Sequence, residues 1–315
     1  MSGDRGCLPP VAGGIVDRLL AGVFMDLGGD HRDAVFVAGS GRSGTSWLAD
    51  LINHRRDHRY VFEPFDPRRV KLCGHFRSRQ YLRPEDRREE YLAPARRILS
   101  GGLRSRWTDR FHRTFVARRR VIKDIRANLL LGWLHRNFPG MPIVFLLRHP
   151  VAAVLSQISL GWRDVLDETL EQRELLEDFS LPLEEMHAAR DPFERRLFLW
   201  CVENYVPLRQ LGVEGACVVF YENLVLRPER ELRRLFACLG RDFDGRVLDC
   251  LERPSPLSRR RSWLAARDPG AWRREISGAR LDRAVEVLAL FGLDGIYAGD
   301  PEPDAAGLQA LGSRA

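Results

Sequence analysis

The chain has 315 residues, of which 44% are hydrophobic, so it is long enough to build one large α/β domain around a buried core. Its formal net charge of +7 comes almost wholly from arginine, since Lys71 and Lys123 are its sole lysines, and this charge favours anionic partners. The sequence has no run of about 18 uncharged apolar residues that could span a membrane, and its N-terminus lacks the features of a secretory signal. We therefore expect a cytoplasmic protein without a transmembrane segment.

The six cysteines include no C-x-x-C pair, which speaks against a zinc site or a disulfide framework. Cys217 lies in an apolar run, and Cys201 and Cys238 lie in helical patterns. We expect buried thiols in a reducing compartment and no bound metal.

Short apolar, β-branched runs alternate with helical patterns along most of the chain. The predicted strands are residues 34–38, 59–62, 120–123, 142–147 and 216–221, and the predicted helices are residues 46–53, 149–157 and 228–239. This alternation predicts an α/β fold, with a parallel β-sheet flanked by helices. Residues 77–120 are strongly charged and are expected to form helices and loops.

The main domain is predicted over residues 34–298, after an N-terminal helical extension over residues 1–33 that includes an amphipathic helix at 15–27. Residues 164–190, rich in Glu, Asp and Leu, are expected to be helical and to form a lid or a wall of the acceptor site. Residues 299–315, rich in Pro, Ala, Gly and Asp, are expected to be a disordered tail.

A glycine-rich loop, residues 39–47, follows the first predicted strand and opens a helix. In this context backbone N–H groups at a helix N-terminus bind a phosphate, and glycine lets the backbone approach the anion closely. The loop is close to the Walker A pattern, but Thr45 stands where that pattern has lysine, and the cation, Arg42, lies inside the loop. An ATP or GTP hydrolase needs that lysine, so the loop favours a different phosphate ligand.

A second candidate anion site follows the strand 142–147. Arg148 ends this strand, Pro150 opens a helix, and Ser156 comes eight positions after Arg148. An arginine offers a multi-donor fork to a phosphate, and a serine hydroxyl adds a donor.

Together, the loop and the Arg148/Ser156 pair resemble the family of sulfotransferases that use PAPS (3′-phosphoadenosine 5′-phosphosulfate) as donor. The resemblance covers residues 34–275 and implies a P-loop-like sulfotransferase fold. It implies that Arg148 and Ser156 bind the 3′-phosphate of the donor. It also implies a 5′-phosphosulfate loop made of Arg42, Ser43, Gly44, Thr45, Ser46 and Trp47.

Two later segments resemble the same family. Tyr221, in the segment 220–224, matches a tyrosine that lies near the adenine. Arg260, in the basic run 259–262, falls where the family often places basic residues on the 3′-phosphate, although a solvated basic run explains this match nearly as well.

Family resemblance also suggests the catalytic residues. Small-molecule members have a histidine just after a lysine-bearing strand, but here Lys123 is followed by Asp124. Carbohydrate-type members more often use a glutamate, and Phe62-Glu63-Pro64 is similar to their motif. We therefore predict Glu63 as the general base, with Asp124 as the rival. Arg42 would stabilise the bridging oxygen as PAP, the desulfated product, leaves, and Lys123 would contact the sulfonate.

The predicted reaction is sulfonate transfer from PAPS to the hydroxyl of a carbohydrate, on a glycolipid or glycosylated metabolite. Trp107, Trp162 and Tyr91 are available to stack on sugar rings, whereas His54, His58 and His112 are interpreted as ordinary surface residues; these assignments rest on sequence position alone.

Three alternatives stay open: a P-loop kinase, a protein that binds PAP without turnover, and an arginine-rich nucleic-acid binder. The ordered α/β pattern argues against the last, so we expect no nucleic-acid partner. The sequence allows a homo-oligomer and identifies neither the acceptor nor the pathway.

Overall fold

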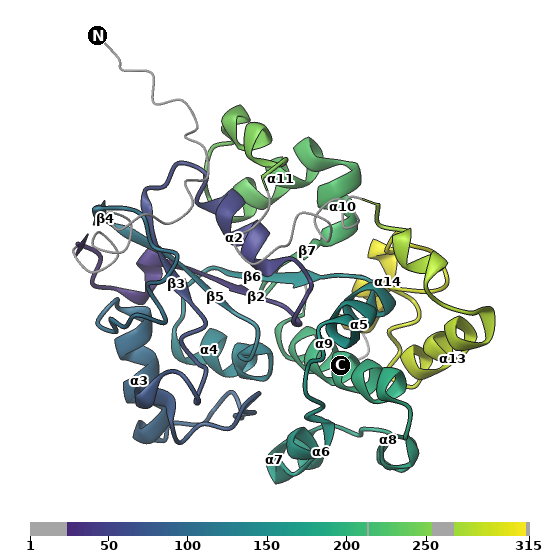
Figure 1. Ribbon diagram of the computed structural model, residues 1–315. Helices are drawn as coiled ribbons and strands as arrows, with labels where there is room; N and C mark the ends of the chain where they lie inside the picture. Colours follow the sequence, from purple (N-terminus) through teal and green to yellow (C-terminus); the bar gives the residue numbers. More distant parts are fainter. Residues whose placement is uncertain (1–23, 213, 254–267, 313–315) are drawn as a thin grey trace.

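The computed structural model of the protein describes residues 24–212, 214–253 and 268–312. At its centre lies a five-stranded sheet with strand order β3-β5-β2-β6-β7, in which every pairing is parallel (Figure 1). The strands are β2 (Ala34–Ala38), β3 (His58–Phe62), β5 (Arg119–Asp124), β6 (Ile143–Leu147) and β7 (Cys217–Phe220). A separate two-stranded sheet pairs β1 (Met25–Asp26) with β4 (Val116–Ala117).

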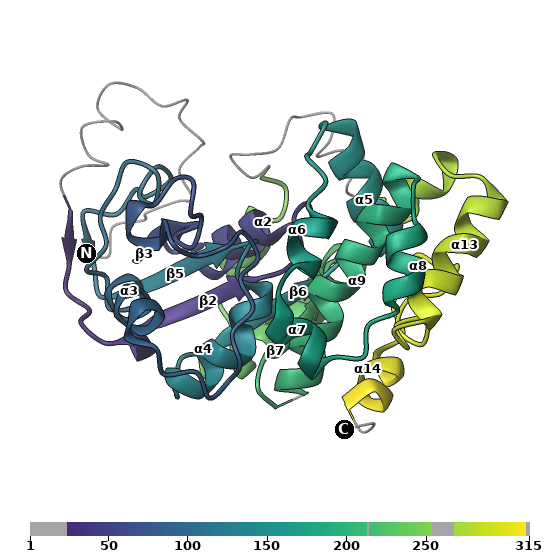
Figure 2. The same ribbon diagram turned by 90° about the horizontal axis from the view of Figure 1, so that it is seen from below.

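Helices cover both faces of the central sheet (Figures 1 and 2). The helices are α2 (Thr45–Ile52), α3 (Glu89–Leu99), α4 (Leu131–Asn137), α5 (Pro150–Ser159), α6 (Leu166–Leu170), α7 (Arg173–Asp178), α8 (Leu183–Ala188), α9 (Pro192–Leu211), α10 (Tyr221–Leu226), α11 (Pro228–Cys238), α13 (Gly278–Ala289) and α14 (Ala305–Gly312). None of the described helices is long and apolar enough to cross a membrane.

The alternation of side chains along β2 divides the core into two layers. Val35 and Val37 pack with α2 and α11 on one face, whereas Phe36 and Ala38 pack with α4 and α9 on the other. All five residues of β2 are buried, because the strand is central and both of its faces are covered.

The predicted α/β fold class is confirmed, and each strand and helix predicted between residues 34 and 239 is present with shifts of one or two residues at its ends. Tyr221, placed at a strand end by the sequence, instead begins α10. Residues 164–190 are helical as expected, in α6, α7 and α8. The charged region 77–120 contains α3, but it also supplies β4 and the start of β5.

The prediction of a disordered tail from residue 299 is wrong for residues 305–312, which form α14. Leu311 of this helix is buried, and its carbonyl oxygen accepts a 3.0 Å hydrogen bond from Arg209 Nη1 of α9. The apolar residues of α14 therefore dock this short helix on the domain, although the segment is rich in Pro, Ala, Gly and Asp.

The predicted N-terminal helical extension lies largely outside the described residues. Its described part, from residue 24, holds the strand β1 and a 3-10 turn at His31–Asp33 rather than a helix. Asp26 explains this difference, because its carboxylate pairs with Arg59 Nη1 at 3.0 Å and with Arg120 Nε at 2.8 Å. Both arginine side chains are fully buried, so the chain is held extended along the sheet edge.

Several histidines and one cysteine also differ from expectation. His58 and His112 are buried rather than on the surface, since His58 opens β3 and His112 packs edge-on against Phe24 with ring centroids 4.3 Å apart. Cys238 is exposed, whereas the other thiols in the described ranges are buried as predicted; Cys7 lies outside those ranges.

Candidate active site

The predicted site residues converge at the edge where the carboxyl ends of the parallel strands meet. The glycine-rich loop follows β2, Glu63 follows β3, and Arg148 follows β6, while Lys123 and Asp124 end β5. In open parallel sheets, ligands bind at this edge.

The loop after β2 is held by polar side chains that sequence reasoning did not single out. Asn128 Oδ1 accepts a 3.2 Å hydrogen bond from the backbone N–H of Gly39, and Gln157 Nε2 donates to the carbonyl of Gly41 at 2.8 Å. Asn204 Nδ2 of α9 donates to the Ser40 hydroxyl at 2.9 Å. All three amides are buried, and each is partnered by the loop, as buried polar groups normally are. No spacing pattern in the sequence marks them.

Two glycines of the loop have no room for a side chain. A Cβ on Gly41 would lie 2.3 Å from the Trp162 ring, and one on Gly44 would lie 2.8 Å from the Tyr221 ring. Gly44 also has a φ of 98°, in the region that glycine adopts without strain. The loop is therefore packed between two aromatic rings.

Helix α2 begins directly after this loop. Its N-cap, Gly44, provides no side-chain cap, so the first-turn N–H groups, beginning at Thr45 and Ser46, have no side-chain acceptor there. The Ser43 hydroxyl is buried and has no hydrogen-bond partner within the described part of the chain. Trp47, one turn into the helix, packs edge-on against Tyr221 with ring centroids 5.7 Å apart. This end of α2 has the donors that an anion requires.

The structure brings the first and second predicted anion sites together. Arg42 Nε donates to the Ser156 hydroxyl at 3.1 Å, and Arg148 Nη1 donates to the Arg42 carbonyl at 2.9 Å. The Arg148 guanidinium lies over the Tyr221 ring, 4.4 Å from its centroid. Burial, and then the nearby charge of Arg148, lower the pKa of Arg42. Two cations held this close in a half-buried site favour a multiply charged anion.

The predicted base, Glu63, is buried in a network of ion pairs. Its Oε1 lies 2.6 Å from Lys123 Nζ, its Oε2 pairs with Arg126 Nη1, and its backbone N–H donates to the Lys123 carbonyl at 2.7 Å. Burial opposes ionisation of Glu63, but the charges of Lys123 and Arg126 outweigh it, so the pKa of the carboxyl is lowered. Glu63 is therefore ionised at neutral pH, which is the form that can accept a proton.

Asp124, the rival base, has a different environment. Its carboxylate is fully buried and accepts 2.8 Å hydrogen bonds from the backbone N–H groups of Phe65 and Arg126. Burial, and then the charge of Glu63, raise the pKa of Asp124 to about 6.

Arg126 is a further site residue that sequence reasoning missed. It pairs with Glu63 and, at 3.3 Å, with Asp66, and it contributes the second cation of the Glu63 network. Its place two residues after the Lys123-Asp124 pair that ends β5 was visible in the sequence, but nothing there showed that its side chain turns back toward Glu63.

The predicted sugar-stacking residues have separate positions. Trp162 covers Gly41, and Trp107 donates from Nε1 to the Glu63 carbonyl at 3.2 Å, so both border the site. Tyr91 belongs to α3, where it packs edge-on against Phe76. Arg260 lies outside the described residues.

A family model described as "Sulfotransferase family" matches residues 34–245 of the chain. A search of curated proteins found no match. The solved structures similar to this chain include a sulfotransferase domain from the curacin biosynthetic pathway, with 15% identity over 93% of this chain and 98% of that one and a TM-score of 0.44.

Mouse sulfotransferase SULT7A1 complexed with PAP matches with 12% identity over 94% of this chain and 92% of that one, at a TM-score of 0.46. A sulfotransferase from Alicyclobacillus acidocaldarius matches with 19% identity over 89% and 96%, at a TM-score of 0.43. These likenesses are too distant to supply a role for any residue of this chain. The family model covers most of the chain, including the loop, the Glu63 network and the Arg148 site, and the chain therefore belongs to the sulfotransferase family, from which its PAPS dependence follows.

Proposed function

We propose that this sulfotransferase transfers the sulfonate of PAPS to a hydroxyl of a carbohydrate, carried by a glycolipid or a glycosylated metabolite, with Glu63 as general base. The observation that carries the proposal is the arrangement at one edge of the sheet. There, a cationic cluster of Arg42 and Arg148 adjoins the loop, and an ionised carboxylate is held against Lys123 on the neighbouring strand.

The described residues fit the donor. The buried Ser43 hydroxyl lacks a partner in the described ranges, and the uncapped start of α2 offers backbone N–H groups to a 5′-phosphate. We assign the 3′-phosphate to Arg148 and Ser156, and the adenine to the neighbourhood of Tyr221, whose ring lies beneath the Arg148 guanidinium.

In the proposed reaction the acceptor oxygen forms a bond to sulfur while the bond from sulfur to the bridging oxygen breaks. The electron pair of that bond stays on the phosphate of PAP, and the acceptor proton moves to Glu63. Arg42 stabilises the charge that develops on the bridging oxygen, and Lys123 exchanges its contact with Glu63 for one with the sulfonate. That exchange frees Glu63 Oε1 to accept the proton.

The choice of Glu63 over Asp124 rests on their protonation states. The lowered pKa of Glu63 keeps it ionised, whereas Asp124 is a weaker candidate because both of its oxygens accept backbone hydrogen bonds. Support for the carbohydrate class comes from the missing histidine after Lys123 and from Trp107 and Trp162 at the border of the site, since indole rings stack on sugars.

The test is transfer of label from [35S]PAPS to a panel of sugars, glycolipids, phenols and tyrosyl peptides. Labelled sugar products are expected. Labelled phenols without a sugar product would refute the acceptor class, and PAP binding without any labelled product would favour a protein that binds PAP without turnover.

A further inference from the structure

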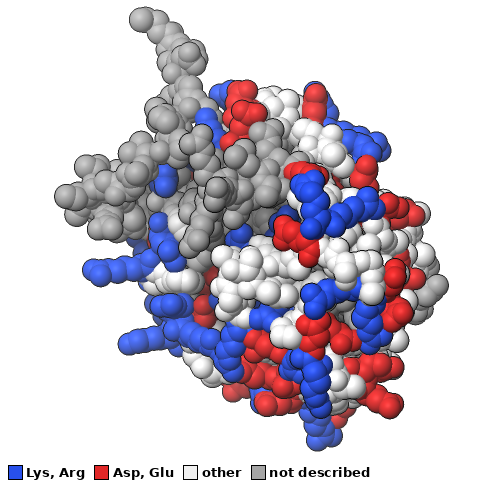
Figure 3. All heavy atoms as spheres, turned by 45° about the vertical axis from the view of Figure 1, so that its right-hand side comes forward, with Lys and Arg blue, Asp and Glu red and all other residues white. Residues whose placement is uncertain are grey.

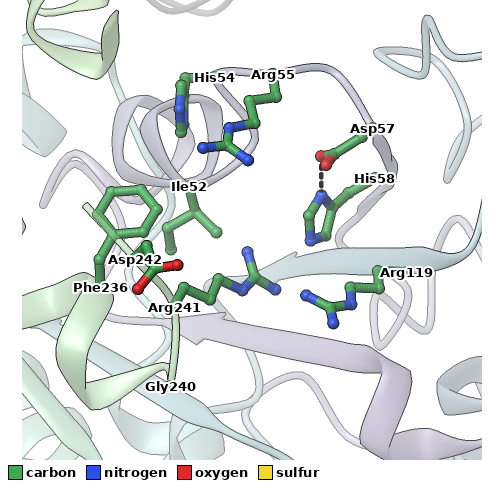
Figure 4. Close-up of a pocket in the computed structure, with 10 residues that line it drawn as sticks. All are labelled: Ile52, His54, Arg55, Asp57, His58, Arg119, Phe236, Gly240, Arg241 and Asp242. Carbon is green, nitrogen blue, oxygen red and sulfur yellow. Dashed lines mark hydrogen bonds and ion pairs between the residues drawn. The ribbon is translucent and has the colours of Figure 1, made fainter. Parts of the chain in front are cut away.

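A second polar pocket lies at the opposite edge of the sheet from the candidate active site. It is a cavity of 260 Å³ between the end of α2, the start of β3, the start of β5 and the end of α11 (Figure 4). Its lining residues are Ile52, His54, Arg55, Asp57, His58, Arg119, Phe236, Gly240, Arg241 and Asp242. The amino ends of the strands form this edge, so nothing in the proposed sulfonate transfer uses it.

The backbone fixes two of the polar side chains side by side. His58 and Arg119 are partners in the parallel pairing of β3 with β5, so their side chains project from the same face of the sheet. Asn53 holds His58 in place, since its Oδ1 accepts from the His58 N–H at 3.0 Å and its Nδ2 donates to the His58 carbonyl at 3.1 Å.

Arg241 reaches the same cavity from the end of α11. Its backbone N–H donates to the Phe236 carbonyl at 2.8 Å, and Gly240 before it has a φ of 62°, which turns the chain at the end of the helix. Figure 4 shows the guanidinium groups of Arg241 and Arg119 pointing toward one another across the cavity.

Neither of these two arginines is directly paired with a carboxylate within residues 24–212, 214–253 and 268–312, although Asp57 and Asp242 also line the pocket. No hydrogen bond or ion pair joins either guanidinium to a described residue, whereas Arg55 pairs with Asp244 at 2.9 Å. Burial, and then the charge of Arg119, lower the pKa of Arg241. Elsewhere, basic and acidic side chains are interspersed on the face seen in Figure 3, and ion pairs such as Arg283 with Glu194 are common.

A buried imidazole completes the pocket. His58 is 4% exposed; its Nδ1 pairs with Asp57, while its Nε2 is buried with no hydrogen-bond partner among the described residues. In Figure 4 the His58 ring lies between Asp57 and the two arginines. A buried polar atom normally has a partner, so this one suggests a group that occupies the cavity.

Two guanidinium groups without a hydrogen-bonded partner among the described residues suit a tetrahedral oxyanion with two negative charges. His58 Nδ1 already donates to Asp57, so Nε2 donates to this anion in the protonated imidazole, the form that a bound anion favours. The pocket volume of 260 Å³ is the space that eight or nine water molecules occupy at roughly 30 Å³ each. It can therefore hold an organic group as well as the anion. We propose that this pocket binds the phosphate monoester group of a small molecule, with Arg119, Arg241 and His58 as its anion ligands.

Histidine NMR of the full chain tests the proposal, because His58 reports on this pocket and not on the active site. The protein, labelled with 15N at its eight histidines, is titrated with sodium sulfate, sodium phosphate or phenyl phosphate at constant ionic strength, and His58→Gln assigns the signal. The His58 imidazole signals should shift and saturate with all three. Exclusion of phenyl phosphate, while the inorganic ions bind, would overturn the assignment to a monoester.

Charge variants separate a site from a general salt effect. Arg241→Gln and Arg119→Gln should each weaken sulfate binding at His58 by at least about tenfold, as expected for loss of a charge-assisted hydrogen bond. Arg136→Gln, which removes an exposed arginine of α4, is the matched control and should change nothing. A His58 shift that does not saturate, or that is the same in all three variants, would overturn the proposal.

Discussion

At the scale of single residues, Glu63 is the side chain on which the proposed chemistry depends most. It has two cationic partners, Lys123 and Arg126, and it is the sole carboxylate that we place on the acceptor. Glu63→Gln removes the proton acceptor, so turnover should fall by about two to four orders of magnitude while PAP affinity stays nearly unchanged. Single-turnover rates with labelled PAPS, and calorimetry with PAP, measure the two quantities.

Asp66→Asn is the matched control, because Asp66 also pairs with Arg126 but does not contact Lys123 through a described ion pair. This variant should keep turnover within a few fold of the parent. Normal turnover in Glu63→Gln, together with loss of turnover in Asp124→Asn, would make Asp124 the base instead.

Sequence reasoning reached the residues that belong to motifs and missed those that act through tertiary contacts. Arg42 and the Arg148/Ser156 pair were predicted as parts of two anion sites, and the structure brings them together. Arg126 and the amides that hold the loop were missed, because a buried amide or an arginine that turns back on its own strand leaves no spacing pattern. His58 was misjudged because its charged neighbour Arg59 projects from the opposite face of β3. His112 was misjudged because its packing against Phe24 is a tertiary contact.

At the scale of secondary-structure elements, Asp26 ties the two-stranded sheet to the central one. Its carboxylate accepts from Arg59 on β3 and makes two hydrogen bonds to Arg120 on β5, with all three side chains at most 3% exposed. Asp26→Ala would leave the buried Arg120 without its carboxylate partner and Arg59 with Asp109 alone, which should cost about 3–5 kcal/mol of unfolding free energy.

Urea unfolding followed by circular dichroism measures this loss. Glu302→Ala, which breaks an ion pair with Arg227 whose side chains are about half exposed, is the comparison and should cost at most about 1 kcal/mol. Equal losses in the two variants would show that the buried network contributes no more than a surface pair.

The elements themselves were largely predictable, but their arrangement was not. Buried strands such as β2 and β6 read as continuous apolar runs, and Pro150 and Pro228 mark helix starts. The order of the strands depends on which side each crossover connection takes, and no local pattern specifies that. The helix α14 was missed because its docking on α9 is a tertiary contact.

At the scale of the whole molecule, ligand binding should raise stability in a way that discriminates between nucleotides. PAP at about 100 times its dissociation constant should stabilise the protein by roughly 2.7 kcal/mol without any added metal, whereas Mg·ATP should give no comparable shift. Thermal unfolding measures both. Stabilisation by Mg·ATP alone would revive the kinase alternative.

Arg148→Ala should weaken PAP binding by about 10- to 150-fold but leave binding of 5′-AMP, which lacks a 3′-phosphate, little changed.

The pH dependence of global stability should show the raised pKa of Asp124. Asp124 has a pKa of about 6 in the folded state and an ordinary value of 3.8. Between about pH 4 and pH 6, the native state therefore keeps a proton on this carboxyl that the unfolded chain has lost. The contribution of this carboxyl to stability therefore falls as pH rises through that window, by about 2 kcal/mol.

Asp124→Asn cannot titrate, so the difference in unfolding free energy between parent and variant should fall by that amount from pH 4 to pH 6.5. Other buried groups with shifted pKa values, such as Glu222 and His149, are common to both proteins and cancel in this difference. A difference that is constant with pH would mean that Asp124 ionises at its ordinary pKa.

The strand order also governs when the protein can begin to fold during synthesis. The central strand β2 is the first of the five to be made, yet its neighbours β5 and β6 lie far downstream, and a parallel sheet offers no hairpin as a local substitute. At roughly 5–20 residues per second, Ala34–Ala38 waits about 4–16 seconds for Arg119–Asp124 to follow it. During that interval β2 has no strand partner, so we expect the nascent chain to be prone to aggregation until β5 has been made.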